Sequence, residues 1–134
     1  MQNAYLVCIL LFVSSNCSFS QIQLTIEIEN LRNDSGVILL ELLDSEENSI
    51  GGETGQISNR KCVIVFENLT PTKYAIRYFH DENSNNNLDL NFMGIPKEGY
   101  GMSNNAYGLF GPKDFNDWLF LLSSSTKITL RPKY

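Results

Sequence analysis

Apolar and polar residues alternate with a period of two in several short runs of this chain, and this pattern most constrains its fold. In the run IQLTIEI, residues 22–28, every second side chain is apolar and would share one face of an extended strand. Further apolar runs lie at 37–43, 62–66, 74–80, 118–122 and 127–130. No run with helical spacing exceeds about two turns. Six or seven short strands predict an all-β chain folded as a single antiparallel β-sandwich.

The connections between the runs contain turn-forming residues. The segment NLRNDSG, residues 30–36, separates the first two runs and predicts a hairpin between them. The segment DSEENSIGGETGQ, residues 44–56, is acidic and glycine-rich and has no periodic apolar face. It predicts a surface loop, with a short edge strand as the alternative.

One pair of runs has a more specific character. In VIVFENLTPTKYAI, residues 63–76, an apolar strand is followed by Leu69, a turn at Pro71, and Tyr74 at the start of the next strand. This order resembles the prealbumin-like and collagen-adhesin-repeat sandwiches, and it implies an immunoglobulin- or prealbumin-like sandwich of about seven strands. We expect Tyr74 to pack across one end of it and to find a loop carbonyl as hydrogen-bond partner.

The first twenty residues differ from the rest. Residues 4–13, AYLVCILLFV, are uncharged and apolar but too short to span a bilayer, and the small polar stretch SSNCSFS follows them. This arrangement predicts a secretory signal peptide at 1–20 and a mature β-sandwich domain at 21–134, exported to the periplasm or the exterior. The alternative is a lipid attached to Cys17, which would tether the protein to a membrane.

Cysteine usage and charge restrict the function classes further. Removal of residues 1–20 would leave Cys62 as the only cysteine, and its alternation with Ile64 and Phe66 predicts a core position. The formal net charge of −5 argues against nucleic acid or anionic lipid as a partner. A cell-surface glycan or a protein remains as the partner class.

The chain has one long connection, the 37 residues between His80 and Trp118. Connections of this length are functional or disordered, and the composition here argues against disorder. We expect an ordered flap folded over one end of the sandwich, with these apolar side chains buried beneath it: Phe92, Met93, Ile95, Tyr100, Met102, Tyr107, Leu109, Phe110 and Phe115.

The start of this connection, HDENSNNNLDLNF, predicts a calcium loop. Asp81, Asn83 and Asn85 occupy positions one, three and five of a D-x-N-x-N run, and oxygen ligands at alternate positions suit calcium. The expected ligand set is completed by the Asn87 carbonyl, by Asp89 and by Glu98 folding back.

Two positions depart from the calcium-loop pattern, and the segment has an alternative structural explanation. Asn86 stands where such loops have glycine, and Phe92 stands where they have a bidentate glutamate. The alternative is a series of Asx turns, in which the Asp and Asn side chains accept hydrogen bonds from neighbouring backbone amides while Leu88 anchors the loop.

Two other functional hypotheses involve the same region. A hydrolase would use His80, the only histidine, as a base together with Asp81 or Glu98, although its strand parity with Tyr74 favours a structural role. A glycan- or peptide-binding module would use Tyr100 and Tyr107 as an aromatic platform. The first choice is a non-enzymatic exported module with a binding or structural role.

The run YAIRYFHDENSNNNLDLNFMGIPKEGYGMSNNAYGLFGPKDFND carries a family likeness through its HDEN, LD, GIPKEGYG, SNNA and FGP elements. It resembles the bacterial exported family catalogued as domain of unknown function 2141, and the likeness extends from Ile22 to the C-terminus. The resemblance implies an extracytoplasmic β-sandwich and one ordered unit at 80–115. No catalytic residues carry over from this family. Its members usually have glycine in the Asn-rich loop, where this chain has Ser84 and Asn86.

Overall fold

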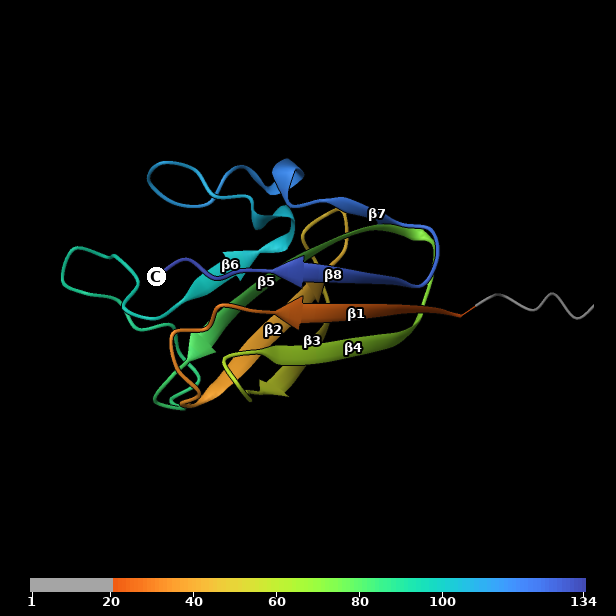
Figure 1. The fold of residues 1–134 in the computed structure, drawn as a ribbon. Helices are drawn as coiled ribbons and strands as arrows, with labels where there is room; N and C mark the ends of the chain where they lie inside the picture. Colours follow the sequence, from red (N-terminus) through yellow and green to blue (C-terminus); the bar gives the residue numbers. More distant parts are fainter. Residues whose placement is uncertain (1–20) are drawn as a thin grey trace, which may run out of the picture.

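The computed structural model describes residues 21–134, which form two packed β-sheets (Figure 1). These residues contain eight strands, so the all-β sandwich is confirmed. Their bounds are β1 Ile22–Ile28, β2 Val37–Leu43, β3 Ser49–Gln56, β4 Cys62–Leu69, β5 Thr72–Asp81, β6 Tyr100–Met102, β7 Phe120–Leu122 and β8 Thr126–Leu130. Two single-turn 3₁₀ helices, η1 Ser103–Asn105 and η2 Phe115–Asp117, interrupt the long connection.

The smaller sheet has the order β4-β1-β8, and the larger one has the order β3-β2-β5-β6. β7 also pairs with β5, at residues 72–74, next to the stretch that pairs with β6. The β1–β8 pairing is parallel, which differs from the antiparallel arrangement expected throughout. Parallel pairing arises because the C-terminal strand returns beside β1 after crossing from the larger sheet.

The core lies between the two sheets and is built by the period-two pattern. The buried side chains of β1 and β4 face those of β2 and β5: Ile22, Leu24, Ile26, Ile28, Cys62, Ile64, Ile38, Leu40, Leu42, Tyr74, Ile76 and Tyr78. Burial raises the pKa of the Cys62 thiol to about 11, so this cysteine is an inert core residue as expected. The Tyr74 hydroxyl donates to the Thr70 carbonyl at 2.9 Å, which confirms its predicted partner.

One local prediction is wrong, and one is decided in favour of its alternative. β1 and β2 do not form a hairpin, because β1 pairs with β4 and β8 whereas β2 pairs with β3 and β5. The segment 30–36 instead carries the chain from one sheet to the other. Residues 49–56 form the edge strand β3, so the edge-strand alternative is confirmed over the surface loop, and the strand pairs with β2 although most of its side chains are exposed.

The signal peptide predicted for residues 1–20 and the lipid alternative at Cys17 lie outside the described residues. Within residues 21–134, no helix has the length and apolar character needed to cross a membrane.

Candidate functional site

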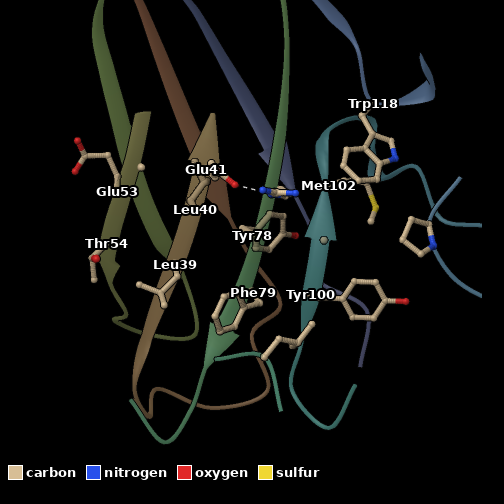
Figure 2. Close-up of a pocket in the computed structure, with 15 residues that line it drawn as sticks. Leu39, Leu40, Glu41, Glu53, Thr54, Tyr78, Phe79, Tyr100, Met102 and Trp118 are labelled. Carbon is tan, nitrogen blue, oxygen red and sulfur yellow. Dashed lines mark hydrogen bonds and ion pairs between the residues drawn. The ribbon is translucent and has the colours of Figure 1, made fainter. Parts of the chain in front are cut away.

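The outer face of the larger sheet carries an apolar groove, which Figure 2 shows from close by. The core takes Leu40 and Tyr78, so the alternate residues on β2 and β5 point away from it. The strand register aligns Leu39 of β2 with Phe79 of β5, and Phe79 with Tyr100 of β6. Three apolar side chains therefore form a row across three neighbouring strands on the side that the smaller sheet does not cover.

The long connection forms the far wall of this groove. Leu88, Pro112 and Trp118 line it from that side, and Met102 lines it from β6. The cavity volume is about 460 Å³, within the range of small-molecule sites. We call this site the outer-face groove, defined by Leu39, Phe79, Leu88, Tyr100, Met102, Pro112 and Trp118.

One charged pair lies within the outer-face groove. Arg77 donates from Nε to the Glu41 carboxylate at 2.5 Å, in the cross-strand row next to Leu39 and Phe79. Both side chains of this pair already have a charged partner, and Glu53 and Thr54 of β3 add a second polar edge to the apolar surface. The indole of Trp118 is held in place, because its Nε1 donates to the Lys113 carbonyl at 3.1 Å.

The two tyrosines predicted to form a ligand platform lie in contact, but only Tyr100 lines the outer-face groove. Tyr100 is half-buried and lines the groove. The Tyr107 hydroxyl is engaged by two backbone carbonyls, at 2.6 Å from Arg131 and 3.0 Å from Tyr100. Burial raises the pKa of Tyr107 to about 12. The two rings meet edge to face, with centroids 6.1 Å apart, so Tyr107 supports Tyr100 rather than extending a platform.

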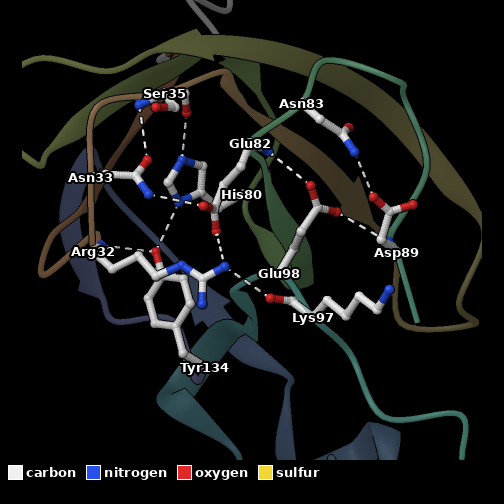
Figure 3. A network of polar contacts seen from close by, with 10 residues as sticks. All are labelled: Arg32, Asn33, Ser35, His80, Glu82, Asn83, Asp89, Lys97, Glu98 and Tyr134. Atoms are coloured by element: carbon white, nitrogen blue, oxygen red, sulfur yellow. Dashed lines mark hydrogen bonds and ion pairs between the residues drawn. The ribbon is translucent and has the colours of Figure 1, made fainter. Parts of the chain in front are cut away.

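His80 is fully buried and both of its ring nitrogens have partners, as Figure 3 shows. Nε2 lies 2.7 Å from the Ser35 carbonyl, which can only accept, so this nitrogen carries the proton. Nδ1 lies 2.8 Å from the Tyr134 hydroxyl and accepts from it. The same hydroxyl accepts from the backbone N–H of Arg32 at 3.1 Å.

This arrangement corrects the hydrolase hypothesis and the assignment of His80 as a ligand-binding residue. A general base needs a free nitrogen within reach of a substrate proton, and His80 has no free nitrogen and no exposed surface. His80 instead fastens the C-terminal Tyr134 to the connection between β1 and β2.

Asp81, the first predicted metal ligand, is a buried acceptor for the loop that follows it. Its Oδ1 accepts from the backbone N–H of Asn85 at 3.1 Å, and its Oδ2 accepts from that of Asn86 at 2.8 Å. Ser84 and Asn86 both have left-handed backbone angles, with φ of 57° and 62°, and these angles curl the loop around the carboxylate. We call residues 81–89 the carboxylate loop.

The other predicted ligands of the carboxylate loop form Asx turns and side-chain pairs. Asn83 Oδ1 accepts from the Asn85 N–H at 3.2 Å, and Asn85 Oδ1 accepts from the Asn87 N–H at 2.9 Å. The amide groups of Asn83 and Asn85 donate to the two oxygens of Asp89, at 2.6 and 3.0 Å. These contacts are those of the alternative explanation, a series of Asx turns.

Glu98 does fold back onto the carboxylate loop, as expected, but its partners are backbone amides. Its two oxygens accept from the N–H groups of Glu82 at 2.9 Å and Asp89 at 3.1 Å (Figure 3). Glu98 is almost fully buried. It therefore joins the two ends of the loop in the way a bidentate metal ligand would.

Within residues 21–134, no three His, Cys, Asp or Glu side chains lie close enough together to hold a metal ion. Of the six predicted ligands, the side chains of Asn83, Asn85 and Asp89 converge, while the carboxylates of Asp81 and Glu98 are occupied by backbone amides. Calcium binding stays a prediction.

A second network fixes the carboxylate loop to the body. The Arg32 guanidinium lies 4.8 Å over the Tyr134 ring, pairs with the Glu82 carboxylate at 2.6 Å and donates to the Lys97 carbonyl at 2.9 Å. Burial alone would raise the pKa of Glu82, but hydrogen bonds from Asn33 and Arg32 and the Arg32 charge hold it below its ordinary value. Gly99 is required here, because a Cβ at this position would collide with the Tyr134 ring.

The apolar residues of the long connection divide into two groups, which corrects the expected flap. Met102 is buried, and Tyr100, Tyr107 and Phe115 are half-buried. The remaining five are exposed: Phe92, Met93, Ile95, Leu109 and Phe110. They occupy two loops, 90–96 and 107–112, each closed by an isolated β-bridge. We call these loops the apolar tips.

Sequence reasoning found Tyr100 but missed most of the outer-face groove. The signal was present in β2, where VILLELL is apolar at both parities, so that Leu39 falls on the face opposite the core. A strand that is apolar on both faces needs a cover on both. Phe79 carries the same signal on β5.

Comparisons with known proteins identify a family but no activity. A family model described as "Uncharacterized protein conserved in bacteria (DUF2141)" matches residues 26–129. No curated protein matches the chain. The matched region covers seven of the eight strands completely or in large part, together with the whole long connection. The chain therefore belongs to the DUF2141 family of uncharacterised bacterial proteins.

Proposed function

We propose that this protein is an exported, non-enzymatic binding module that takes an apolar group into the outer-face groove. The observation that carries this proposal is the row Leu39, Phe79 and Tyr100, which forms a second apolar face on a sheet whose first face already fills the core. An uncovered apolar face of this kind marks an interaction site. Export is supported by the uncharged apolar stretch at 4–13.

The shape of the groove favours a flat or elongated apolar group. The floor is a β-sheet surface, and Trp118 stands beside it next to Met102 (Figure 2). Leu88 and Pro112 also line the groove. Ordered aromatic walls bind apolar groups with little loss of side-chain entropy, and Trp118 is already fixed by its hydrogen bond to Lys113. The Glu41–Arg77 pair offers a polar contact at the edge. A fatty acyl chain and the apolar side chains of a peptide share this chemistry.

Trp118 makes the proposal directly testable, because it is the only tryptophan in the chain. We expect its fluorescence to shift to shorter wavelength and to saturate on titration with one of two probes, lauric acid or an acetylated and amidated Leu-Phe-Leu peptide. The first result would indicate a lipid-like ligand and the second a peptide. The substitution Leu39→Glu places a charge in the groove and should weaken binding at least about tenfold.

The matched control is Val65→Glu, which places the same charge on an exposed apolar site of β4, on the outer face of the other sheet. This variant should bind like the wild type. Binding that is equally sensitive to both substitutions, or no saturable change with either probe, would overturn the assignment of the groove.

The carboxylate loop supports a second proposal, calcium binding, through a separate observation. The side chains of Asn83, Asn85 and Asp89 converge, and the left-handed angles at Ser84 and Asn86 give the curled backbone that oxygen-rich calcium loops require. We propose weak calcium binding at this point, in which the side-chain amides of Asn83 and Asn85 rotate so that their oxygens face the ion and give up the hydrogen bonds that they accept from the N–H groups of Asn85 and Asn87. One carboxylate and two neutral amides would give an affinity at or below the millimolar range of extracellular calcium modules.

A further inference from the structure

The apolar tips expose large side chains almost completely. Phe92 retains 97% and Leu109 retains 91% of its accessible surface, and the neighbouring Phe110 is fully exposed. Single exposed apolar residues are common on protein surfaces, but five of them in two adjacent loops form a cluster that water solvates poorly.

The tips are held outward by their own hydrogen bonds. In the first loop the Asn91 side chain accepts from the N–H groups of Met93 and Ile95 at 2.8 and 3.0 Å, and the Asn91 N–H donates to the Ile95 carbonyl at 2.8 Å. In the second loop the Gly108 N–H donates to the Gly111 carbonyl at 2.6 Å. The side chains at the turns are therefore presented by closed loops with a defined shape.

Both tips lie at the same end of the sandwich. A cavity of about 550 Å³ separates them and is lined by Gly94 and Ile95 from one loop and by Leu109 and Phe110 from the other. Figure 1 shows the two loops extending from the end of the molecule that also holds the C-terminus. The start of β1 lies at the opposite end.

Lysines accompany the tips closely. Lys97 directly follows the first loop, Lys113 directly follows the second, and Lys133 lines the cavity between them. The stretches 90–97, LNFMGIPK, and 107–113, YGLFGPK, contain no acidic residue, and the acidic residues that border them are Asp89, Glu98 and Asp114. Glu98 is buried and accepts from backbone N–H groups, and Asp89 is half-buried and accepts from the amide groups of Asn83 and Asn85. The charged side chains of the two loops themselves are therefore lysines, although the whole chain has a net charge of −5.

We propose that the apolar tips dock this end of the protein on a lipid bilayer that contains anionic headgroups. Exposed Phe, Leu, Ile and Met side chains can enter the boundary between headgroups and acyl chains, while lysines around them extend their ammonium groups to the anionic headgroups. Separate projecting side chains suit a fluid acyl layer, which closes around each of them. A protein partner would need a matching recess for each tip.

The local charge, not the net charge, decides this interaction. Charges more than about 10 Å from the contact are screened at moderate ionic strength, so the acidic residues of the far end contribute little. The net charge of −5 therefore does not oppose a contact made through Lys97, Lys113 and Lys133.

Vesicle sedimentation tests the proposal with the protein purified after export from cells expressing the full chain, its N-terminus determined by mass spectrometry. Vesicles of phosphatidylcholine alone are compared with vesicles that also contain phosphatidylglycerol. We expect stronger binding to the anionic vesicles and a loss of at least about tenfold in partitioning for the double variant Phe92→Ser, Phe110→Ser. Lys113→Gln should reduce binding to the anionic vesicles by about fivefold and leave the weak binding to neutral vesicles unchanged.

Matched controls use the same chemistry elsewhere on the surface. Leu121→Ser removes an exposed apolar side chain of β7, and Lys73→Gln removes an exposed lysine of β5; both should bind vesicles like the wild type. All variants share the same N-terminus, so any contribution of residues 1–20 cancels in the comparison.

Three outcomes would overturn the proposal. The first is vesicle binding by the wild type that the double variant retains. The second is no vesicle binding, together with a concentration-dependent dimer that the double variant abolishes, which would make the tips an interface between two copies of this chain. The third is no vesicle binding and no dimer, which would leave a protein partner as the occupant. None of these outcomes depends on ligand binding in the outer-face groove.

Discussion

The two parts of the long connection follow opposite rules. The carboxylate loop and Glu98 place charged groups in the interior and give both carboxylates of Asp81 and Glu98 backbone partners. The apolar tips, only a few residues away, place phenylalanine and leucine side chains in water. Polar groups fix this segment to the body, so its apolar groups are not needed for anchoring. The difference separates the residues that stabilise the segment from those left available for binding.

The largest expected effect is the removal of Glu98. Glu98→Ala leaves the partly buried N–H groups of Glu82 and Asp89 without an acceptor, and each unsatisfied donor costs about 1–3 kcal/mol. We expect the free energy of unfolding, measured by urea denaturation, to fall by about 3 kcal/mol. Glu46→Ala, at an exposed position before β3, should change it by less than about 0.5 kcal/mol. Equally small losses in the free energy of unfolding for both variants would show that Glu98 does not stabilise the carboxylate loop.

The second effect concerns the link made by Tyr134. Tyr134→Phe keeps the ring that contacts Arg32 but removes the hydroxyl that joins His80 to the Arg32 N–H. We expect a loss of about 1–2 kcal/mol in urea denaturation, because His80 is buried and its Nδ1 would have no donor. If His80→Phe in the Tyr134→Phe background lowered the free energy of unfolding no further, the two side chains would act as one unit. Additive losses would contradict that unit.

A smaller effect arises from the ionisation of Glu82. Its pKa is lowered in the folded protein from an ordinary value of 4.5, so the charged form is stabilised by folding. This contribution is fully present above pH 4.5 and is lost as the pH falls through the lowered pKa. Because the pair with Arg32 is partly solvated, we expect the ionisation of Glu82 to contribute less than about 1 kcal/mol to the free energy of unfolding. In urea denaturation at several pH values, the stability difference between wild type and Glu82→Gln should shrink below pH 4.5; a constant difference would contradict this assignment.

The sequence predicts the body of this fold well because the period-two pattern is local. Residues 22–28 and 37–43 are strands with the expected bounds, and Tyr74 and Cys62 have the expected environments. Strand partners are not local, so the hairpin expected across 30–36 is wrong. A run of turn residues looks the same whether it joins neighbours in one sheet or crosses between two.

The candidate site was predictable only in part. The spacing of Asp81, Asn83 and Asn85 showed that the loop curls, but a carboxylate that accepts two backbone N–H groups has the same spacing as one that binds an ion. The apolar composition of 90–112 predicted burial, because sequence alone does not show that Asp81, Glu98 and Arg32 already anchor the segment. The outer-face groove depends on the register of β2, β5 and β6, which only the tertiary structure fixes.

Calcium bound to the carboxylate loop would stabilise the folded protein by a small amount. With a dissociation constant near 1 mM and an equal calcium concentration, mass action adds only about 0.4 kcal/mol to stability. We expect a melting temperature that rises by about 2–3 °C or less at this concentration, and calorimetric heat that Asp89→Asn abolishes. Magnesium at the same concentration should have no effect, since it loses its water ligands reluctantly. No heat and no shift at millimolar calcium would remove the ion from this loop.

The smallest expected effect on stability belongs to the apolar tips. Phe92 and Phe110 bury almost no surface, so Phe92→Ser and Phe110→Ser together should change the free energy of unfolding by less than about 0.5 kcal/mol. A large loss in urea denaturation would mean that these side chains pack against the body in solution, and the tips would no longer be available for docking. An unchanged free energy of unfolding combined with lost vesicle binding would separate the two roles within one segment. The carboxylate loop and Glu98 would stabilise the fold, and the apolar tips would contact the membrane.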